Sequence, residues 1–251
     1  SLNLTTDKEC KIRSELYDLH FDKCPRMCDL GFLEIDKNRK DSFKNLENVC
    51  VELLHNGILP LVIGGGHDIT YAIYKAYSVI DKSITLTTVD KKFDLGNKDE
   101  KISNTNFFSK ILEAKPNNLF HYNNIGYQTF FVSPLAVKML DDLNFDVLRL
   151  GNVNSRIRNV EPVLRNTDLL SFDLSSVKSS DLNANKYSSA NGFSAVEACK
   201  IMRYAGLSDK ITSLAICEYN QLLDLNGLTS QLISQMIWYF IEGVKSRKNE
   251  L

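Results

Sequence analysis

Short apolar runs rich in β-branched residues alternate with helical patterns along this chain, and that alternation restricts the folds it can adopt. The predicted strands are 27–32, 59–63, 84–89, 119–125, 145–150, 169–173 and 211–217. The predicted helices are about 7–19, 43–54, 69–80, 107–115, 134–143, 154–166, 195–205 and 229–245. Strands joined by helices need right-handed crossovers and form a mostly parallel sheet with helices on both faces. The pattern predicts an α/β fold, although a closed barrel of parallel strands would show the same alternation.

The strand predicted at 59–63 ends at three consecutive glycines, which are followed by His67 and Asp68. Glycines permit positive φ and a close approach of the backbone to other groups, so the next side chain can turn back over the end of the strand. The stretch does not meet the dinucleotide-binding fingerprint, and it has no P-loop ending. A simple tight turn is the alternative for this stretch taken alone.

Polar side chains stand at the ends of four predicted strands: His67, Asp90, Asp173 and Glu218. In open parallel sheets ligands bind at the carboxyl ends of the strands, so these residues form one candidate site. Asp94 follows Asp90 in the same loop. One imidazole with three carboxylates suits Mn, Fe or Zn, whereas each aspartate taken singly could instead cap a helix.

Composition narrows the class of partner. The chain has 251 residues, 43% hydrophobic and 24% charged, which is enough for one large domain over 1–251. Thirty basic and 31 acidic residues give a net charge of -1 without a basic block, so we expect a small-molecule ligand, no nucleic acid and no membrane. The lack of a membrane-spanning run and of a signal-peptide pattern predicts a cytoplasmic protein.

The six cysteines are scattered through predicted helices and strands, so we expect reduced thiols. Cys24 and Cys28 have a spacing that some zinc sites use, but no second pair of ligands is placed to complete such a site. His20, His55 and His121 lie within predicted helices or strands and are expected to be packed core histidines.

Four segments of the chain carry a resemblance. They are Gly65-Gly66-His67-Asp68, Asp90-Lys91-Lys92-Phe93-Asp94, Ser171-Phe172-Asp173-Leu174-Ser175 and Glu218-Tyr219-Asn220. In this order they resemble the signatures of the ureohydrolases, the family of arginase, agmatinase and formimidoylglutamase. Asn124-Ile125-Gly126-Tyr127-Gln128 and the last helix with Trp238 are more similar to the formimidoylglutamase branch. The resemblance spans nearly the whole chain and implies a three-layer α/β/α arginase-like fold with a mostly parallel, mostly eight-stranded sheet, shortened here by about the first strand.

The resemblance also implies a metal centre, because the family holds two manganese ions that share a bridging hydroxide. His67, Asp90, Asp94 and Asp173 match the four protein ligands of one ion. Lys92 stands where the family has a metal-binding histidine of the companion ion, and Ser175 stands where it has an aspartate ligand. We therefore expect either one Mn²⁺ per chain or a metal-free site, and no second ion.

Lys92 and Glu218 are the candidate catalytic residues. A Lys92 ammonium beside Asp90 and Asp173 could supply charge in place of the missing ion, or it could point to solvent. Glu218 matches the family acid that receives the planar cationic group of the substrate, and a carboxylate is a natural partner for that shape. The alternative for Glu218 is an acid at a helix N-terminus.

Two functions remain open on the sequence. The first is hydrolysis of a C–N bond in a guanidino or formimino compound by metal-bound hydroxide at a single-metal site. The second is a catalytically inactive arginase-like protein retained for ligand binding or oligomeric assembly. The last predicted helix, 229–245, is apolar nearly all round and favours a homo-oligomer.

Overall fold

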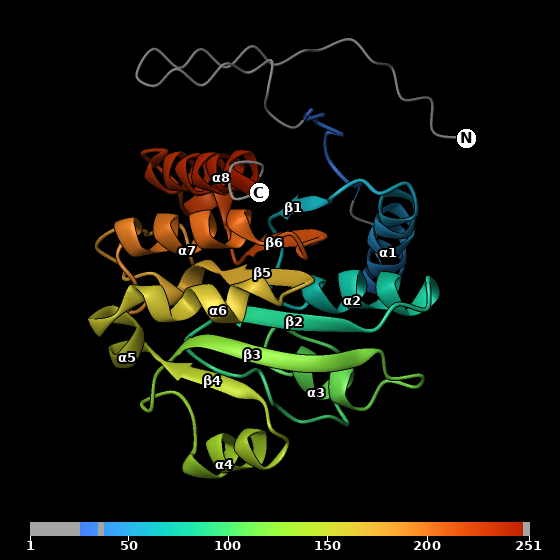
Figure 1. The fold of residues 1–251 in the computed structure, drawn as a ribbon, viewed down its shortest axis with the longest axis horizontal. Helices are drawn as coiled ribbons and strands as arrows, with labels where there is room; N and C mark the ends of the chain where they lie inside the picture. Colours follow the sequence, from blue (N-terminus) through green and yellow to red (C-terminus); the bar gives the residue numbers. More distant parts are fainter. Residues whose placement is uncertain (1–25, 35–37, 248–251) are drawn as a thin grey trace.

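A computed structural model describes residues 26–34 and 38–247, and the central feature of this part is a parallel β-sheet (Figure 1). Six strands pair in the order β1-β6-β5-β2-β3-β4, and every pairing is parallel. Their bounds are β1 Leu61–Ile63, β2 Ile84–Val89, β3 Leu119–Tyr127, β4 Asp146–Arg149, β5 Leu169–Asp173 and β6 Ser213–Cys217. The α/β class is confirmed, and the sheet is open rather than a closed barrel.

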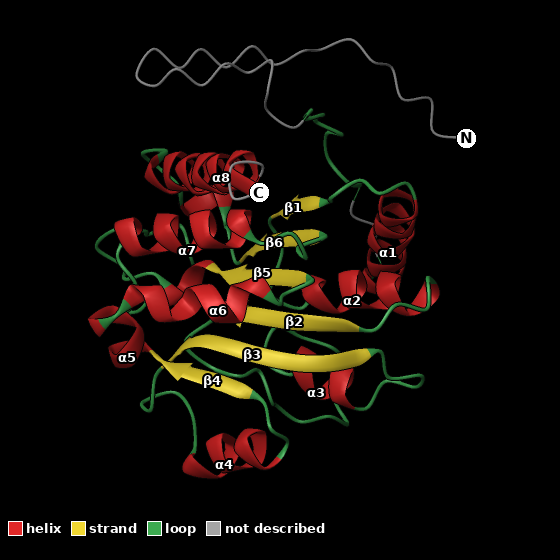
Figure 2. Cartoon of the chain, viewed as in Figure 1, coloured by secondary structure: helices red, strands yellow, loops and turns green. Residues whose placement is uncertain are grey.

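Helices cover both faces of the sheet, which gives three layers (Figure 2). One face carries α1 Arg39–His55, α2 Ile69–Val79, α3 Phe107–Leu112 and α4 Pro134–Asp142. The other carries α5 Leu150–Ser155, α6 Val160–Arg165, α7 Ala195–Leu207 and α8 Leu228–Ser246. In Figure 1, α8 lies outside α7, and the two helices meet where Gly206 and Gly243 leave no room for a side chain.

The central strands are buried on both faces, which explains their nearly continuous apolar sequences. In β5, Leu170 and Phe172 enter the core under α7, whereas Leu169 enters the core on the opposite face. The strand at 84–89 is also completely buried. Each strand therefore contributes to two cores at once.

The order of the strands places a crevice between β2 and β5. The chain proceeds from β2 to β3 and β4 on one side, and then returns so that β5 pairs with the other side of β2. Connections that leave neighbouring strands in opposite directions open a space beyond their carboxyl ends. Asp90 follows β2 and Asp173 ends β5, so both acids lie at this crevice.

Two predictions of secondary structure are wrong in the part described. Residues 27–32 form no strand; the segment is exposed, and Phe32 is fully open to solvent. The predicted helix 154–166 is broken between α5 and α6, and Pro162 stands in the first turn of α6, where no backbone donor is needed. The last predicted helix, 229–245, is confirmed as α8, which is buried mainly on one face and leaves Leu228 and Tyr239 exposed.

Two of the histidines predicted to lie in the core are also placed differently. His55 is exposed at the end of α1. His121 is half-buried, and its Nε2 lies 3.0 Å from Asp146 Oδ2. The predicted helix 7–19, His20 and Cys24 lie outside the described residues, and Cys28 is an exposed free thiol.

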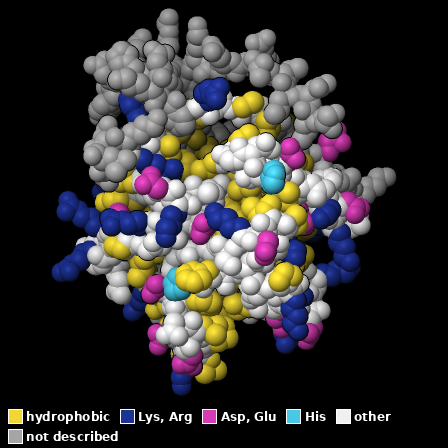
Figure 3. Space-filling view, turned by 45° about the vertical axis from the view of Figure 1, so that its right-hand side comes forward, with side chains coloured by type: hydrophobic (Ala, Val, Ile, Leu, Met, Phe, Trp, Pro, Cys, Tyr) yellow, Lys and Arg dark blue, Asp and Glu magenta, His cyan; other side chains and the backbone are white. Residues whose placement is uncertain are grey.

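The surface agrees with the balanced composition. On the face shown in Figure 3, Lys and Arg side chains are spread out, with acidic and uncharged side chains between them. Among the helices that the structure describes, none combines the length and the apolar character needed to cross a bilayer.

Candidate metal centre

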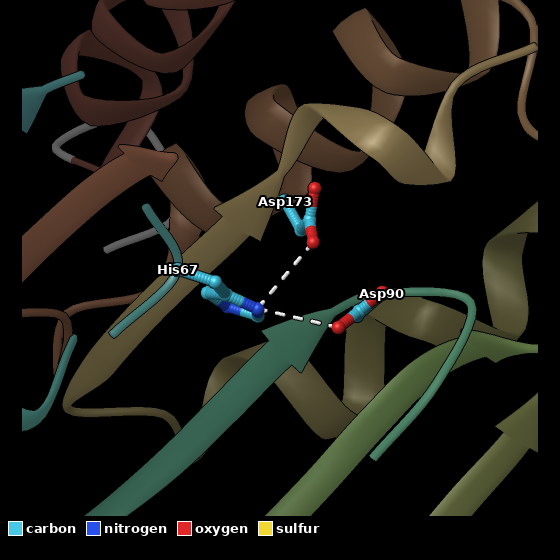
Figure 4. Close-up of side chains that lie close together, drawn as sticks. All are labelled: His67, Asp90 and Asp173. Atoms are coloured by element: carbon cyan, nitrogen blue, oxygen red, sulfur yellow. Dashed lines mark ion pairs between the residues drawn. The ribbon is translucent and has the colours of Figure 1, made fainter. Parts of the chain in front are cut away.

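The loop after β1 brings His67 to the middle of the sheet edge. Gly64 and Gly65 adopt positive φ of 100° and 73°, and Gly65 O accepts a hydrogen bond of 2.8 Å from the Glu218 amide beyond β6. This turn directs the His67 side chain across the sheet toward the ends of β5 and β2 (Figure 4). The glycine run therefore positions a buried imidazole and is more than a simple turn.

Three carboxylates surround one nitrogen of His67. Its Nδ1 lies 2.9 Å from Asp94 Oδ2, 3.2 Å from Asp90 Oδ2 and 3.5 Å from Asp173 Oδ2. All four side chains are almost completely buried. The other ring nitrogen, Nε2, lies 3.0 Å from Ser171 Oγ. A proton on Nε2, donated to that hydroxyl, leaves the Nδ1 lone pair facing the carboxylates.

The spacing of these atoms fits a metal ion. Neighbouring ligand atoms of an octahedral shell with bonds of ~2.1 Å lie about 3 Å apart. Single ligand atoms of His67, Asp90 and Asp173 all lie within 4.8 Å of one another. Asp94 contacts His67 but lies outside that trio. Asp90 Oδ2 is buried and accepts no hydrogen bond from the residues that the structure describes, so a bound cation would give this oxygen the partner it lacks.

The pKa values of the side chains in this cluster also indicate that it needs positive charge. Burial raises the pKa of Asp90, and the carboxylates of Asp173 and Asp94 raise it further. Burial also raises the pKa of Asp173. Burial alone would lower the pKa of His67, but its close contacts with the carboxylates of Asp90 and Asp94 outweigh this effect and raise that pKa well above the usual range. A proton or a metal ion is favoured at the centre of this cluster.

Lys92 points into the site rather than to solvent. Its Nζ lies 2.8 Å from Asp94 Oδ1 and 3.5 Å from the carbonyl oxygen of Asn104. Burial opposes the charge, but Asp94 and Asp90 together raise the pKa of Lys92. The solvent-facing alternative for Lys92 is therefore wrong.

Ser175 also lies in the site. It is buried, its amide donates a hydrogen bond of 2.6 Å to Asp173 Oδ1, and its hydroxyl oxygen has no partner among the described residues. The resemblance to the family implies an aspartate ligand at the position of Ser175. A neutral hydroxyl binds a divalent metal ion more weakly than such a carboxylate does.

Glu218 stands at the mouth of the site with one carboxylate oxygen occupied. Its Oε1 accepts hydrogen bonds from the His67 amide at 3.0 Å and from Asn104 Nδ2 at 2.8 Å. The residue has a positive φ of 64°, and the next helical turn begins only at Gln221, so Glu218 is not a helix N-terminal acid. Within the described chain Oε2 receives no protein hydrogen bond and is free to meet a ligand.

A cavity of about 380 Å³ opens above Glu218. Its lining includes Arg39, Gly66, Asn104, Lys186, Tyr187 and Glu218. A site of this volume accommodates a small molecule.

Several residues at this site were missed by reasoning from the sequence. Asn104 holds Glu218, and the buried Lys91 donates from Nζ to the carbonyl oxygen of Tyr187. Asn185 Nδ2 donates a hydrogen bond of 2.7 Å to the carbonyl oxygen of Glu218. The polar segments that carry these residues were predicted as loops. No motif or spacing in the sequence indicates which loop residues turn toward the site.

Comparison with known proteins places the chain in a family. The Arginase family model matches residues 6–242. A formimidoylglutamase of Staphylococcus aureus (strain MSSA476) is 25% identical over 234 residues, which cover 88% of this chain and 73% of the relative.

Solved structures of similar proteins share the fold. Formiminoglutamase of Trypanosoma cruzi, solved with Mn²⁺, superposes with a TM-score of 0.77 at 22% identity, over 85% of this chain and 74% of the other. Formimidoylglutamase of Bacillus subtilis also gives a TM-score of 0.77, at 19% identity over 86% and 71% of the two chains. The protein therefore belongs to the arginase family and is formimidoylglutamase-like.

Proposed function

We propose that this protein hydrolyses a C–N bond of a guanidino or formimino compound, with one Mn²⁺ held by His67, Asp90, Asp94 and Asp173. The observation that carries the proposal is the unpartnered Asp90 Oδ2, which lies 3.2 Å from His67 Nδ1 in a completely buried cluster. Membership of the arginase family and the Mn²⁺ in a solved relative support the choice of reaction and of metal.

The balance of charge supports a single ion. Four carboxylates lie at the site, those of Asp90, Asp94, Asp173 and Glu218, and two lysine side chains, Lys91 and Lys92, interact with them electrostatically. The lysines leave two negative charges, which one divalent cation neutralises. A second divalent cation would have to enter beside the Lys92 ammonium without a carboxylate at position 175.

The residues have separate roles in this proposal. When bound, the ion lowers the pKa of a coordinated water and provides Lewis acidity. Ser171 orients the His67 ring through Nε2, so that Nδ1 is directed at the ion. Glu218 Oε2 receives the planar cationic group of the substrate, and Lys92 holds Asp94 in place through a charged contact.

Metal content tests the proposal directly. Protein purified with added Mn²⁺ is expected to contain one ion per chain by mass spectrometry of its metals, with turnover of a guanidino or formimino compound. Two bound ions would overturn the single-metal proposal. One bound ion without turnover of any such compound would favour the inactive alternative.

Glu218→Gln tests the substrate class. Losing one charged hydrogen bond is expected to weaken binding of N-formimino-L-glutamate or agmatine by about 1 to 3 kcal/mol. Calorimetric titration measures this change, and Glu161→Gln, which changes a half-buried acid paired with Arg165 on α6, serves as the control. Unchanged affinity in the Glu218 variant would remove that residue from the binding site.

The catalytically inactive alternative has a specific observation in its favour. Lys92 and Ser175 both differ from the ligand types of the family's companion ion, and both contact an aspartate of the proposed metal site.

A homo-oligomer and a cytoplasmic location stay predictions. The exposed Leu228 and Tyr239 of α8 are the residues to examine if light scattering shows an oligomer.

A further inference from the structure

A chain of buried polar groups continues from the Nε2 side of His67 into the interior of the protein. Ser171 Oγ lies 3.0 Å from His67 Nε2, and Thr70 Oγ1 lies 2.6 Å from Ser171 Oγ. The sulfur of Cys217 lies 3.6 Å from Ser171 Oγ and 3.9 Å from Thr70 Oγ1. Of these three residues, the proposed function uses only Ser171.

Three elements bring these side chains together. Thr70 lies in the first turn of α2, Ser171 in the middle of β5 and Cys217 at the end of β6. All three residues are completely buried. Because a hydroxyl group in such a position is away from solvent, its proton needs an acceptor within the protein.

A metal ion at His67 would fix the direction in which this chain donates hydrogen bonds. When Nδ1 coordinates the ion, the ring proton lies on Nε2 and is donated to Ser171 Oγ. The proton of the Ser171 hydroxyl then needs a different acceptor, and Thr70 Oγ1 at 2.6 Å is the best placed. Thr70 can in turn donate to the sulfur of Cys217, which is a weak acceptor. In this direction each hydroxyl accepts one hydrogen bond and donates one.

The opposite direction would compete with the metal ion. If Ser171 donates to Nε2, the proton of a neutral ring lies on Nδ1, among the carboxylates and in the place of the ion. Without the Thr70 oxygen, the Ser171 proton would have only the sulfur at 3.6 Å as an alternative to Nε2. Loss of the Thr70 hydroxyl should therefore favour the ring form that cannot bind the ion through Nδ1.

We propose that Thr70 is a positioning residue of the metal centre, because it accepts the proton of Ser171 and so keeps the ring proton of His67 on Nε2. This inference rests on the metal ion of the proposed function, but not on the reaction or the substrate. Thr70 contacts neither of these in the proposal and acts through Ser171 and His67. Residues that orient a metal-binding histidine in this way contribute to metal affinity.

An isosteric substitution tests the role of the oxygen. Thr70→Val keeps the shape of the side chain and removes its hydroxyl group. In titrations of the metal-free protein, this variant should bind Mn²⁺ about tenfold more weakly, the lower end of the range for outer partners of a metal ligand. Thr70→Ser keeps the hydroxyl and should restore most of the affinity. Equal affinity in the parent and in Thr70→Val would overturn the inference.

Thr87→Val is the matched control for the loss of a buried hydroxyl. Thr87 is also completely buried, and its Oγ1 lies 2.6 Å from Thr167 Oγ1. It accepts a further hydrogen bond from Asn123, so its partners lie outside the proposed metal site. Both variants should lower the melting temperature of the metal-free protein, but only Thr70→Val should weaken Mn²⁺ binding. An equal loss of affinity in both would assign the effect to packing and overturn the inference.

Nuclear magnetic resonance follows the ring proton itself. The protein is labelled with ¹⁵N-histidine and loaded with Zn²⁺, which is diamagnetic and suits the same ligands. The sequence has four histidines, so His67→Asn identifies the signals of His67. The parent should show a slowly exchanging Nε2 proton, and Thr70→Val should shift its signal and speed its exchange, because Ser171 becomes a poorer acceptor when it has no acceptor of its own. Identical signals in the two proteins would contradict the role of Thr70.

The outcomes separate this inference from the proposed function. A parent protein that binds neither Mn²⁺ nor Zn²⁺ overturns the proposed metal centre and the role of Thr70 with it. A parent that binds the ion but hydrolyses no guanidino or formimino compound contradicts the reaction, and the affinities of the Thr70 variants still decide the inference. A parent that binds and hydrolyses, with unchanged affinity and unchanged ring signals in Thr70→Val, overturns the inference alone.

Discussion

The same two loops that surround His67 with carboxylates also carry Lys92 and Ser175, and these two groups of side chains differ sharply in what they offer a metal. At His67 Nδ1, three carboxylate oxygens lie within 3.5 Å, and one of them accepts no hydrogen bond. At the other group, the Lys92 ammonium lies 2.8 Å from Asp94 Oδ1, and the buried Ser175 hydroxyl has no hydrogen-bond partner in the described part of the chain. The first group lacks positive charge, whereas the second already contains it.

This difference shows that the number of metal ions a site can bind depends on a small part of the fold. Lys92 stands two residues after Asp90, and Ser175 stands two residues after Asp173, so each of these two short segments supplies side chains to both groups. The order of the strands, the crevice between β2 and β5 and the buried imidazole are all in place. The two side chains of Lys92 and Ser175 are enough to remove the need for a divalent cation at their half of the site.

The largest expected effect comes from removing a carboxylate at His67. Asp90→Asn should lower the affinity for Mn²⁺ by about 100-fold or more, because loss of an outer partner already costs 10- to 100-fold and Asp90 is a direct ligand in our proposal. Titration of the metal-free protein measures the change. Asp146→Asn is the matched control, because that acid also faces a histidine nitrogen at 3.0 Å but lies on the surface. Equal Mn²⁺ affinity in both variants would contradict the assignment of the His67 group.

The next effect concerns the group at Lys92 and Ser175. Lys92→His with Ser175→Asp should allow a second Mn²⁺ to bind, because the change removes one positive charge and adds a carboxylate. Neither single variant should suffice, since each leaves either the ammonium or the weak hydroxyl ligand, so metal binding should be strongly non-additive. Metal content of the two single variants and the double variant measures this. A double variant that binds no more Mn²⁺ than the parent would show that backbone geometry, rather than ligand type, separates the two groups.

The fold was largely predictable because its signals are local. Strands buried on both faces read as apolar β-branched runs, and the helices between them carry clear caps, such as the capping box at Ser194 and Glu197. The segment 27–32 misled the prediction, because its apolar residues have the composition of a strand but make no pairing in the described structure. Composition cannot show whether a neighbouring strand is available.

The site was predictable where residues end strands, and it was missed where loops fold back. His67, Asp90, Asp173 and Glu218 follow directly from the topology of a parallel sheet. Asn104 lies 114 residues from Glu218, and nothing in its surroundings in the sequence marks the 2.8 Å contact between them. Lys92 belonged to a recognised motif, but its direction depended on the fold of the loop, which side-chain type alone does not determine.

The smallest expected effect is a dependence of stability on pH, which tests whether the His67 group takes a proton when it holds no metal. The pKa of His67 is raised in the folded protein, whereas an unfolded histidine has a pKa of about 6.5. Above that pH the folded chain binds more protons than the unfolded chain, so the free energy of unfolding should fall as pH rises from about 6.5 through the raised pKa. Asp90 and Asp173 act with the same sign from about pH 3.9 upward, because their pKa values are raised as well.

The measurement is the melting temperature of metal-free protein between pH 6 and 8.5. We expect a decrease of a few degrees, on the scale of about 2 to 4 °C per kcal/mol for a chain of this size. Added Mn²⁺ replaces the proton, so the increase in melting temperature that it causes should grow with pH. His67→Asn should reduce the slope, and His121→Asn, which changes the half-buried histidine beside Asp146, should preserve it. A flat profile in the parent would mean that no group of the metal-free site releases a proton in this range of pH.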